Sequence, residues 1–147
     1  MTEETTKLIR EIIEENTYLT LATTGGADPW AATLQYVADD DLNLYFVSLP
    51  TSRHMEHITD HPTVGIAIFD SQQAPFTCRG IQIEGTAEAY STHDNPFVRI
   101  GGVDWPEDLQ ELVPGYVAVR VEPQRFFLPR FVVDGVLRDE RIEIGLS

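Results

Sequence analysis

The clearest chemistry in this chain lies in a polar segment that directly follows an apolar run. Residues 44–48 read LYFVS, and Thr51, Ser52, Arg53 and His54 follow them at the expected start of a helix. The first turn of a helix carries backbone N–H groups without intrahelical partners, and these groups favour an anion. Two hydroxyls, a guanidinium and an imidazole beside such a turn therefore predict a site for a phosphate-like group.

Three of the four histidines lie close to this segment, which raises the alternative of a metal site. His54, His57 and His61 are spaced i, i+3 and i+7 and would share one helix face. However, Pro62 should end the helix near His61, no H-E-x-x-H pattern is present, and no cysteine is near. We therefore expect no metal site, and we expect histidines that are solvated or close to the phosphate.

Other residues with chemical potential have an ordinary structural explanation. A nucleophilic Cys78 would need a general base and an oxyanion site, so a thiol in the core or in a loop is the simpler expectation. Trp30 and Trp105 can stack on a planar ring, although packing in a core or an interface is the commoner role of tryptophan. The acidic run 39–41 is expected to be a solvated turn rather than a cation site.

The composition describes one acidic domain spanning residues 1–147. Ten Lys and Arg residues stand against 24 Asp and Glu residues, the formal net charge is −14, and Lys7 is the only lysine. Such a surface repels nucleic acid and anionic membranes. A high negative charge with almost no lysine is typical of cytoplasmic proteins from high-salt organisms, where salt screens the self-repulsion. An acidic protein of an ordinary organism is the alternative.

The compartment is expected to be a reducing cytoplasm. The single cysteine can form no internal disulfide. The first residues, MTEETTKLIREIIEEN, are acidic and periodic, unlike a signal peptide. No apolar run approaches the ~20 residues that span a bilayer.

Two helices are expected at positions that frame the predicted site. Apolar residues at helical spacing predict an N-terminal helix that Thr2 or Thr5 can cap and Asn16 can end. A second, short helix is expected over residues 52–59 and should end at Pro62. Its core-facing residues are expected to be Met55 and Ile58. A further short helix is expected to begin near Trp105, within the loop 95–112.

The remaining chain consists of β-forming runs separated by turns. The runs 30–37 and 42–48 should form a hairpin around residues 39–41, and a closing hairpin is expected around 134–135. The expected strands are 18–23, 30–37, 42–48, 63–69, 80–90, 116–121, 125–133 and 136–144. Because most connections are short turns, we expect a mainly β protein with an antiparallel sheet curled into a barrel.

The order of these elements resembles one known family. The motifs PWAA (29–32), FVSLPTSRH (46–54), HPTV (61–64) and GIQIEGTA (80–87) follow in the same order as in the pyridoxamine 5′-phosphate oxidase-like, FMN-binding split barrels, over roughly residues 5–125. The resemblance is to the short members rather than to the oxidase itself. It implies an antiparallel split β-barrel and a homodimer that holds FMN in a cleft between its subunits.

The resemblance also implies a set of cofactor-binding residues. In the family a strand followed by S-R-K binds the phosphate; here Ser52 and Arg53 match, and His54 stands where the lysine would be. An imidazole would make one phosphate contact dependent on pH. Arg53 can hold a phosphate with two parallel hydrogen bonds. The whole implied set is Ala32 and Thr33 facing the flavin ring, Ser48 near the flavin, Thr51, Ser52, Arg53 and His54 at the phosphate, and Gln82 supplying an amide.

The implied function is an FMN-dependent oxidoreductase that acts on a small molecule whose identity the sequence does not give. No catalytic acid–base pair stands out, but flavin carries hydride chemistry itself. The tail contains Arg138 and Arg141 but does not match the arginine-rich segment with which the oxidase recognises its substrate, so pyridoxamine phosphate is not the expected substrate. The alternative is a non-catalytic module that binds flavin, deazaflavin or haem, although no axial haem ligand can be placed.

Overall fold

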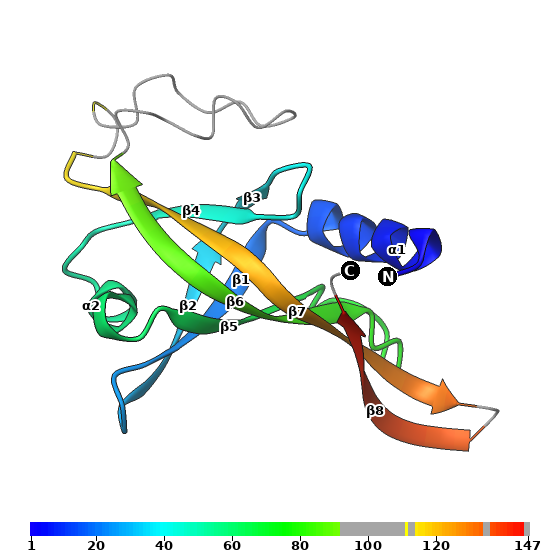
Figure 1. Cartoon of the computed structure of the whole chain (residues 1–147). Helices are drawn as coiled ribbons and strands as arrows, with labels where there is room; N and C mark the ends of the chain where they lie inside the picture. Colours follow the sequence, from blue (N-terminus) through cyan, green and yellow to red (C-terminus); the bar gives the residue numbers. More distant parts are fainter. Residues whose placement is uncertain (92–110, 112–113, 134–135, 146–147) are drawn as a thin grey trace.

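The chain folds into one curled antiparallel sheet with a helix near each end of it (Figure 1). The computed structural model describes residues 1–91, 111, 114–133 and 136–145. Its helices are α1 (Glu3–Glu15) and α2 (Arg53–Asp60). Its strands are β1 (Tyr18–Thr24), β2 (Pro29–Gln35), β3 (Val37–Ala38), β4 (Leu44–Ser48), β5 (Thr63–Phe69), β6 (Gly80–Ser91), β7 (Val117–Val133) and β8 (Val136–Gly145).

The sheet has the topology of a split barrel. The strand order is β2-β1-β5-β6-β7-β4-β3, with β8 paired to β7, and every pairing is antiparallel. The expected fold class is thereby confirmed. In the described sheet, β2 pairs with β1 alone and therefore presents one open edge.

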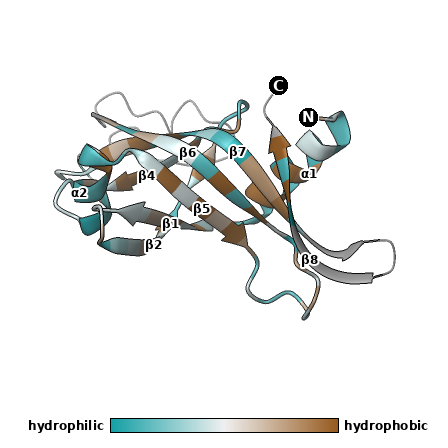
Figure 2. Ribbon diagram, turned by 60° about the horizontal axis from the view of Figure 1, so that its bottom comes forward, coloured by the Kyte–Doolittle hydropathy of each residue, from teal (hydrophilic) through white to brown (hydrophobic). Residues whose placement is uncertain are grey.

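The core lies on one face of the sheet and beneath the helices, and Figure 2 shows the alternation of apolar and polar residues along the strands. Thr2 caps α1 by accepting a hydrogen bond from the Thr5 N–H at 3.1 Å, and Asn16 ends it by donating its amide to the Ile12 carbonyl. Both expected caps are confirmed. The largest fully buried side chains are Phe46, Phe126, Ile9, Ile13, Leu19, Leu21, Leu44, Ile68, Val119 and Val121.

Two strand predictions were wrong in their boundaries. The runs expected at 116–121 and 125–133 form the single strand β7. Pro123 fits inside β7 because it lies opposite Gly85, where the register between β6 and β7 shifts. A Cβ at Gly85 would lie 2.7 Å from a methyl group of Val121, so the two strands come too close there for any side chain.

The other boundary difference concerns the run 30–37, which divides into β2 and β3 at Tyr36. The Tyr36 side chain is buried, and its hydroxyl donates a hydrogen bond to the Ile13 carbonyl of α1. The chain therefore changes partner at this residue, so that β2 pairs with β1 and β3 makes the expected hairpin with β4.

Some expectations fall outside the described residues, namely the helix near Trp105 and the turn at 134–135. The described part of the chain has no helix that is both long and apolar enough to cross a membrane.

Candidate functional site

The N-terminus of α2 lies just after β4, as the sequence predicted. Ser52 is the N-cap residue, but its hydroxyl donates to the Leu49 carbonyl at 2.8 Å and makes no hydrogen bond to a helix N–H. The first-turn amides of α2 are therefore not capped by this side chain, which leaves them suited to an external anion. Thr51, one residue earlier, is exposed.

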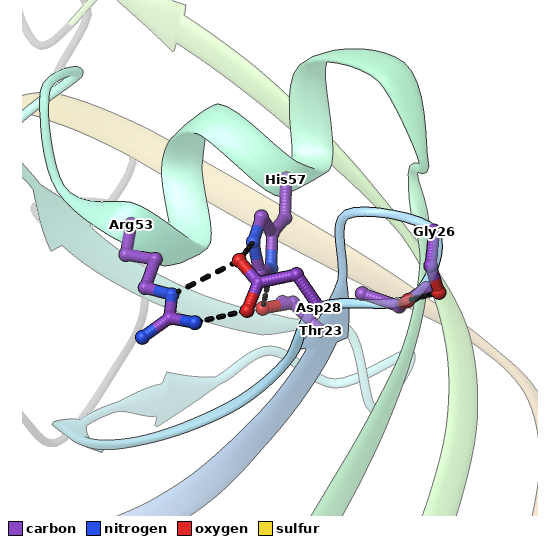
Figure 3. Close-up of polar contacts among 6 residues, drawn as sticks. Thr23, Gly26, Asp28, Arg53 and His57 are labelled. Carbon is purple, nitrogen blue, oxygen red and sulfur yellow. Dashed lines mark hydrogen bonds and ion pairs between the residues drawn. The ribbon is translucent and has the colours of Figure 1, made fainter.

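Arg53 begins α2 and is held by two residues of β2 and the turn before it. Its guanidinium carbon lies 4.3 Å from the centre of the Trp30 ring, a cation–π contact. One edge of the guanidinium faces Asp28: Nε donates to Oδ2 at 3.3 Å, and Nη2 donates to Oδ1 (Figure 3). The Arg53 side chain remains 42% exposed, so solvent still reaches it. The guanidinium thus has a fixed orientation beside the start of α2.

Asp28 and Thr23 also hold His57, which the sequence predicted to be either solvated or close to the phosphate. The Nε2 atom of His57 lies 3.2 Å from Oδ2 of Asp28, and its Nδ1 atom lies 2.9 Å from the hydroxyl of Thr23 (Figure 3). A neutral imidazole satisfies both contacts when Nε2–H donates to the carboxylate and the threonine hydroxyl donates to Nδ1. Hydrogen bonds from Arg53 and then from His57 hold the pKa of Asp28 below its usual 3.8, so this carboxylate is ionised at neutral pH.

The one sequence signal for the buried position of His57 is Gly25 in the turn between β1 and β2. A Cβ atom at Gly25 would lie 2.9 Å from both Cδ2 and Nε2 of His57. The turn therefore packs against the imidazole at a distance that only glycine allows.

His54 points away from this group and organises two serine hydroxyls instead. Its Nε2 atom lies 2.7 Å from the Ser48 hydroxyl and 3.2 Å from the Ser52 hydroxyl. Burial lowers the pKa of His54, and the nearby His57 lowers it further, so the imidazole is neutral at pH 7. The predicted contact of His54 with phosphate stays a prediction, and in this structure its Nε2 atom is already shared by two serines.

The residues predicted to face the flavin ring fall on two faces of the sheet. We define the outer face as the side opposite the core, with Thr20, Ala22, Gly65, Ala67, Gln82, Glu84 and Phe127 lining a hollow of about 290 Å³. Thr33 pairs with Thr20, and Gln82 with Ala67, so both belong to one transverse row of this face. Ala32 pairs with the buried Leu21 and belongs to the core side.

In one chain the predicted residues thus form two separate groups rather than one pocket. Ser48, Ser52, Arg53 and His54 lie together at the junction of β4 and α2. Gln82 lies three strands away from β2 in the sheet, on the outer face.

The histidine spacing does not produce a metal centre in the described residues. No group of three or more His, Cys, Asp or Glu side chains is placed there to hold an ion. His61 lies at the end of α2 and is exposed, whereas the rings of His54 and His57 bond different partners.

The acidic run 39–41 is more organised than a solvated turn. The carboxylate of Asp39 accepts hydrogen bonds from the backbone N–H groups of Asp41 and Asn43 and from the Tyr45 hydroxyl. The carboxylate oxygens of Asp39 are therefore used in hydrogen bonds that stabilise the turn. Asp40 and Asp41 are exposed, as expected.

Cys78 lies half-buried in the loop before β6 and is a free thiol.

Comparison with known protein families gives one match that covers most of the chain. Residues 5–128 match the family described as pyridoxamine 5′-phosphate oxidase. No curated protein matches the sequence significantly.

Among solved structures, General Stress Protein 26 from Bacillus anthracis superposes with a TM-score of 0.65 at 19% identity, covering 96% of this chain and 99% of that one. An FAD-binding protein from Mesorhizobium loti gives 0.62 at 18% identity, covering 82% of this chain and 89% of that one. A protein called an F420 reductase gives 0.60 at 18% identity, covering 80% of this chain and 94% of that one. At these identities the superpositions establish the fold.

Proposed function

Because the chain belongs to the pyridoxamine 5′-phosphate oxidase family, we propose that it binds a flavin-type cofactor, FMN in the first place, with the phosphate at the N-terminus of α2. The observation that carries this proposal is the oriented guanidinium of Arg53 beside first-turn amides that Ser52 leaves uncapped. A guanidinium and helix N–H groups are the donors that phosphate oxygens prefer.

The rest of the cofactor is proposed to lie along the open edge of β2. Backbone N–H and C=O groups of an edge strand lack partners on one side, and the polar rim of a flavin ring can bond them. This path runs from Arg53 past Trp30 toward Ala32 and Thr33, which are on the same strand. Ser48, whose hydroxyl is fixed by His54, is proposed to border the cofactor at the phosphate end.

The partner that completes the site is proposed to be a second copy of the chain. The outer face carries small side chains at Ala22, Gly65 and Ala67, which would let another sheet approach closely. A homodimer packed on this face would bring the Gln82 of one subunit toward a cofactor held by the other. Light scattering should therefore give twice the 16.5 kDa mass of one chain, and a monomer at all protein concentrations would contradict the dimer.

The proposed activity is that of a flavin-dependent oxidoreductase acting on a small molecule in the cytoplasm. When bound, the flavin supplies the hydride chemistry, and the residues described here hold and orient it. The solved relatives called FAD-binding protein and F420 reductase support a cofactor of this type and make FAD and a deazaflavin the next candidates. A non-catalytic flavin carrier is the second function that the same geometry supports.

Two measurements test the proposal in sequence. The first is the absorbance spectrum and mass of any cofactor that is released from the purified protein, followed by titration of the apoprotein with FMN, FAD and a deazaflavin. The second is reduction of the bound flavin by NADH and NADPH under anaerobic conditions. Absence of binding to every flavin would reject the cofactor site, whereas binding without reduction by either donor would favour the carrier.

A further inference from the structure

The guanidinium that is proposed to receive the phosphate already has an anionic partner inside the chain. Asp28 occupies the edge formed by Nε and Nη2 of Arg53, and Trp30 covers one face of the same group. A carboxylate and a phosphate bind arginine through the same two-point geometry. A phosphate at this site must therefore either displace the Asp28 carboxylate or bind beside it.

The charged groups around the start of α2 give this proposed phosphate site little net positive charge. The positive charge of Arg53 is matched by the negative charge of Asp28, and Glu56 places a second carboxylate in the first turn of α2. His54 adds no positive charge because burial keeps its imidazole neutral at pH 7, which follows from the lowered pKa of this group. The chain thus offers hydrogen-bond donors at this position with little net positive charge.

We propose that Asp28 tunes the phosphate charge that this site tolerates, so that FMN binds there but with a larger affinity penalty from Asp28 than a flavin with a singly charged phosphodiester group has. This inference rests on the proposed cofactor site. The physical reason is that the repulsion between the Asp28 carboxylate and the ligand scales with the ligand charge, whereas the hydrogen bonds from the amides of α2 serve both ligand types. Asp28 is accordingly a specificity-determining residue and touches Arg53 rather than the reacting ring.

The expected size of the effect follows from Coulomb's law. Two unit charges about 5 Å apart at a partly exposed site, with an effective dielectric constant of roughly 80 and salt screening, change an affinity by about threefold. A dianion experiences twice that free energy, so its affinity changes by the square, about tenfold. The ratio of the two gains distinguishes a charge effect from a change in shape.

The test is titration of three ligands into wild-type protein and Asp28→Asn at about pH 8, where a phosphate monoester is a dianion because its second pKa is near 6. The ligands are FMN, its monomethyl phosphate ester and riboflavin, which carry two, one and no phosphate charges. We expect Asp28→Asn to bind FMN about tenfold and the ester about threefold more tightly, with riboflavin unchanged. Both gains should shrink in molar salt.

Two further variants control for fold and for charge in general. Asp28→Ala repeats the loss of charge with a different shape. Glu15→Gln removes a carboxylate that binds Arg79 at 2.9 Å and 3.1 Å in the same two-point manner, at the α1 end of the sheet far from α2 (Figure 1), and should change no affinity.

The outcomes separate the two proposals. Equal gains for FMN and the ester in both Asp28 variants would show that Asp28 only blocks the edge of Arg53, and weaker FMN binding would show that Asp28 only positions Arg53; either result, or no gain for FMN, would overturn the charge-selecting role. If none of the three ligands binds either protein, the proposed cofactor site fails and the inference fails with it.

Discussion

Replacing Arg53 by alanine removes the guanidinium beside the start of α2 while leaving the apolar face of that helix intact. Met55 and Ile58 hold α2 on the core, where both side chains are buried, and the substitution leaves both in place. The variant should therefore fold, and its defect should appear in ligand binding.

The expected loss for FMN is about 1.5–3 kcal/mol, or roughly 10- to 150-fold in affinity, which is typical of hydrogen bonds to charged groups. Two features of the site limit this loss of binding free energy. The side chain is 42% exposed, so water screens its charge, and Asp28 already occupies one edge of the guanidinium. Removing Arg53 also leaves the Asp28 carboxylate facing the phosphate without compensation. The double variant Arg53→Ala/Asp28→Asn should therefore recover part of the lost affinity.

The assay is fluorescence quenching on titration with FMN and, in parallel, riboflavin, which lacks the phosphate and should bind Arg53→Ala as it binds the wild type. Arg79→Ala is the matched control, because the Arg79 side chain is 38% exposed and pairs with Glu15 in the same two-point manner. Equal losses for FMN and riboflavin would mean that Arg53 supports the fold, and no loss for either would refute the phosphate assignment.

Three further outcomes follow from charge, burial and packing. The melting temperature should rise from low to molar salt, because the net charge of −14 repels itself in dilute buffer, and a flat or falling curve would argue against a high-salt protein. Burial lowers the pKa of His54 in the fold, so the stability that its neutral form provides is present above about pH 6.5 and is lost as the pH falls below that value. Melting curves at about pH 8 and pH 5.5 should accordingly show a larger drop for wild type than for His54→Gln. Gly25→Ala should cost about 1–3 kcal/mol in chemical denaturation, because the new methyl group would lie 2.9 Å from the His57 ring, and an unchanged midpoint would show that the ring can move aside.

The sequence predicted the fold class and the position of α2 directly after β4, because both depend on local patterns. Periodicity placed α2 to within one residue of its observed ends, and the alternation of β-forming runs with short turns predicted an antiparallel barrel. The join of two expected strands into β7 was missed. Proline inside a strand normally argues against continuity, and the bulge opposite Gly85 that accommodates Pro123 depends on a partner strand far away in the sequence.

The partners of Arg53 were missed for the same reason. Asp28 lies 25 residues before Arg53, with β3 and β4 between them in the sequence, and Asp28 and Trp30 meet Arg53 only because α2 packs over β1 and β2. The sequence left His57 as either solvated or close to the phosphate, and its burial depends on the close approach of the turn at Gly25. Pairings between distant segments leave little trace in a single sequence.

The order of strands in the sheet has a consequence for how the protein reaches this structure. β4 lies in the first third of the sequence but pairs with β7 in the last third, with Leu44 opposite Val121. On its other edge, β7 pairs with β6. A nascent chain that has not yet extended past Val121 therefore holds β4 and β6 as unsatisfied edges. Folding that depends on such distant contacts is slow, in the range of milliseconds to seconds for comparable β domains. The exposed edges of this intermediate are sites for aggregation, so synthesis and refolding should be most vulnerable just before β7 becomes available.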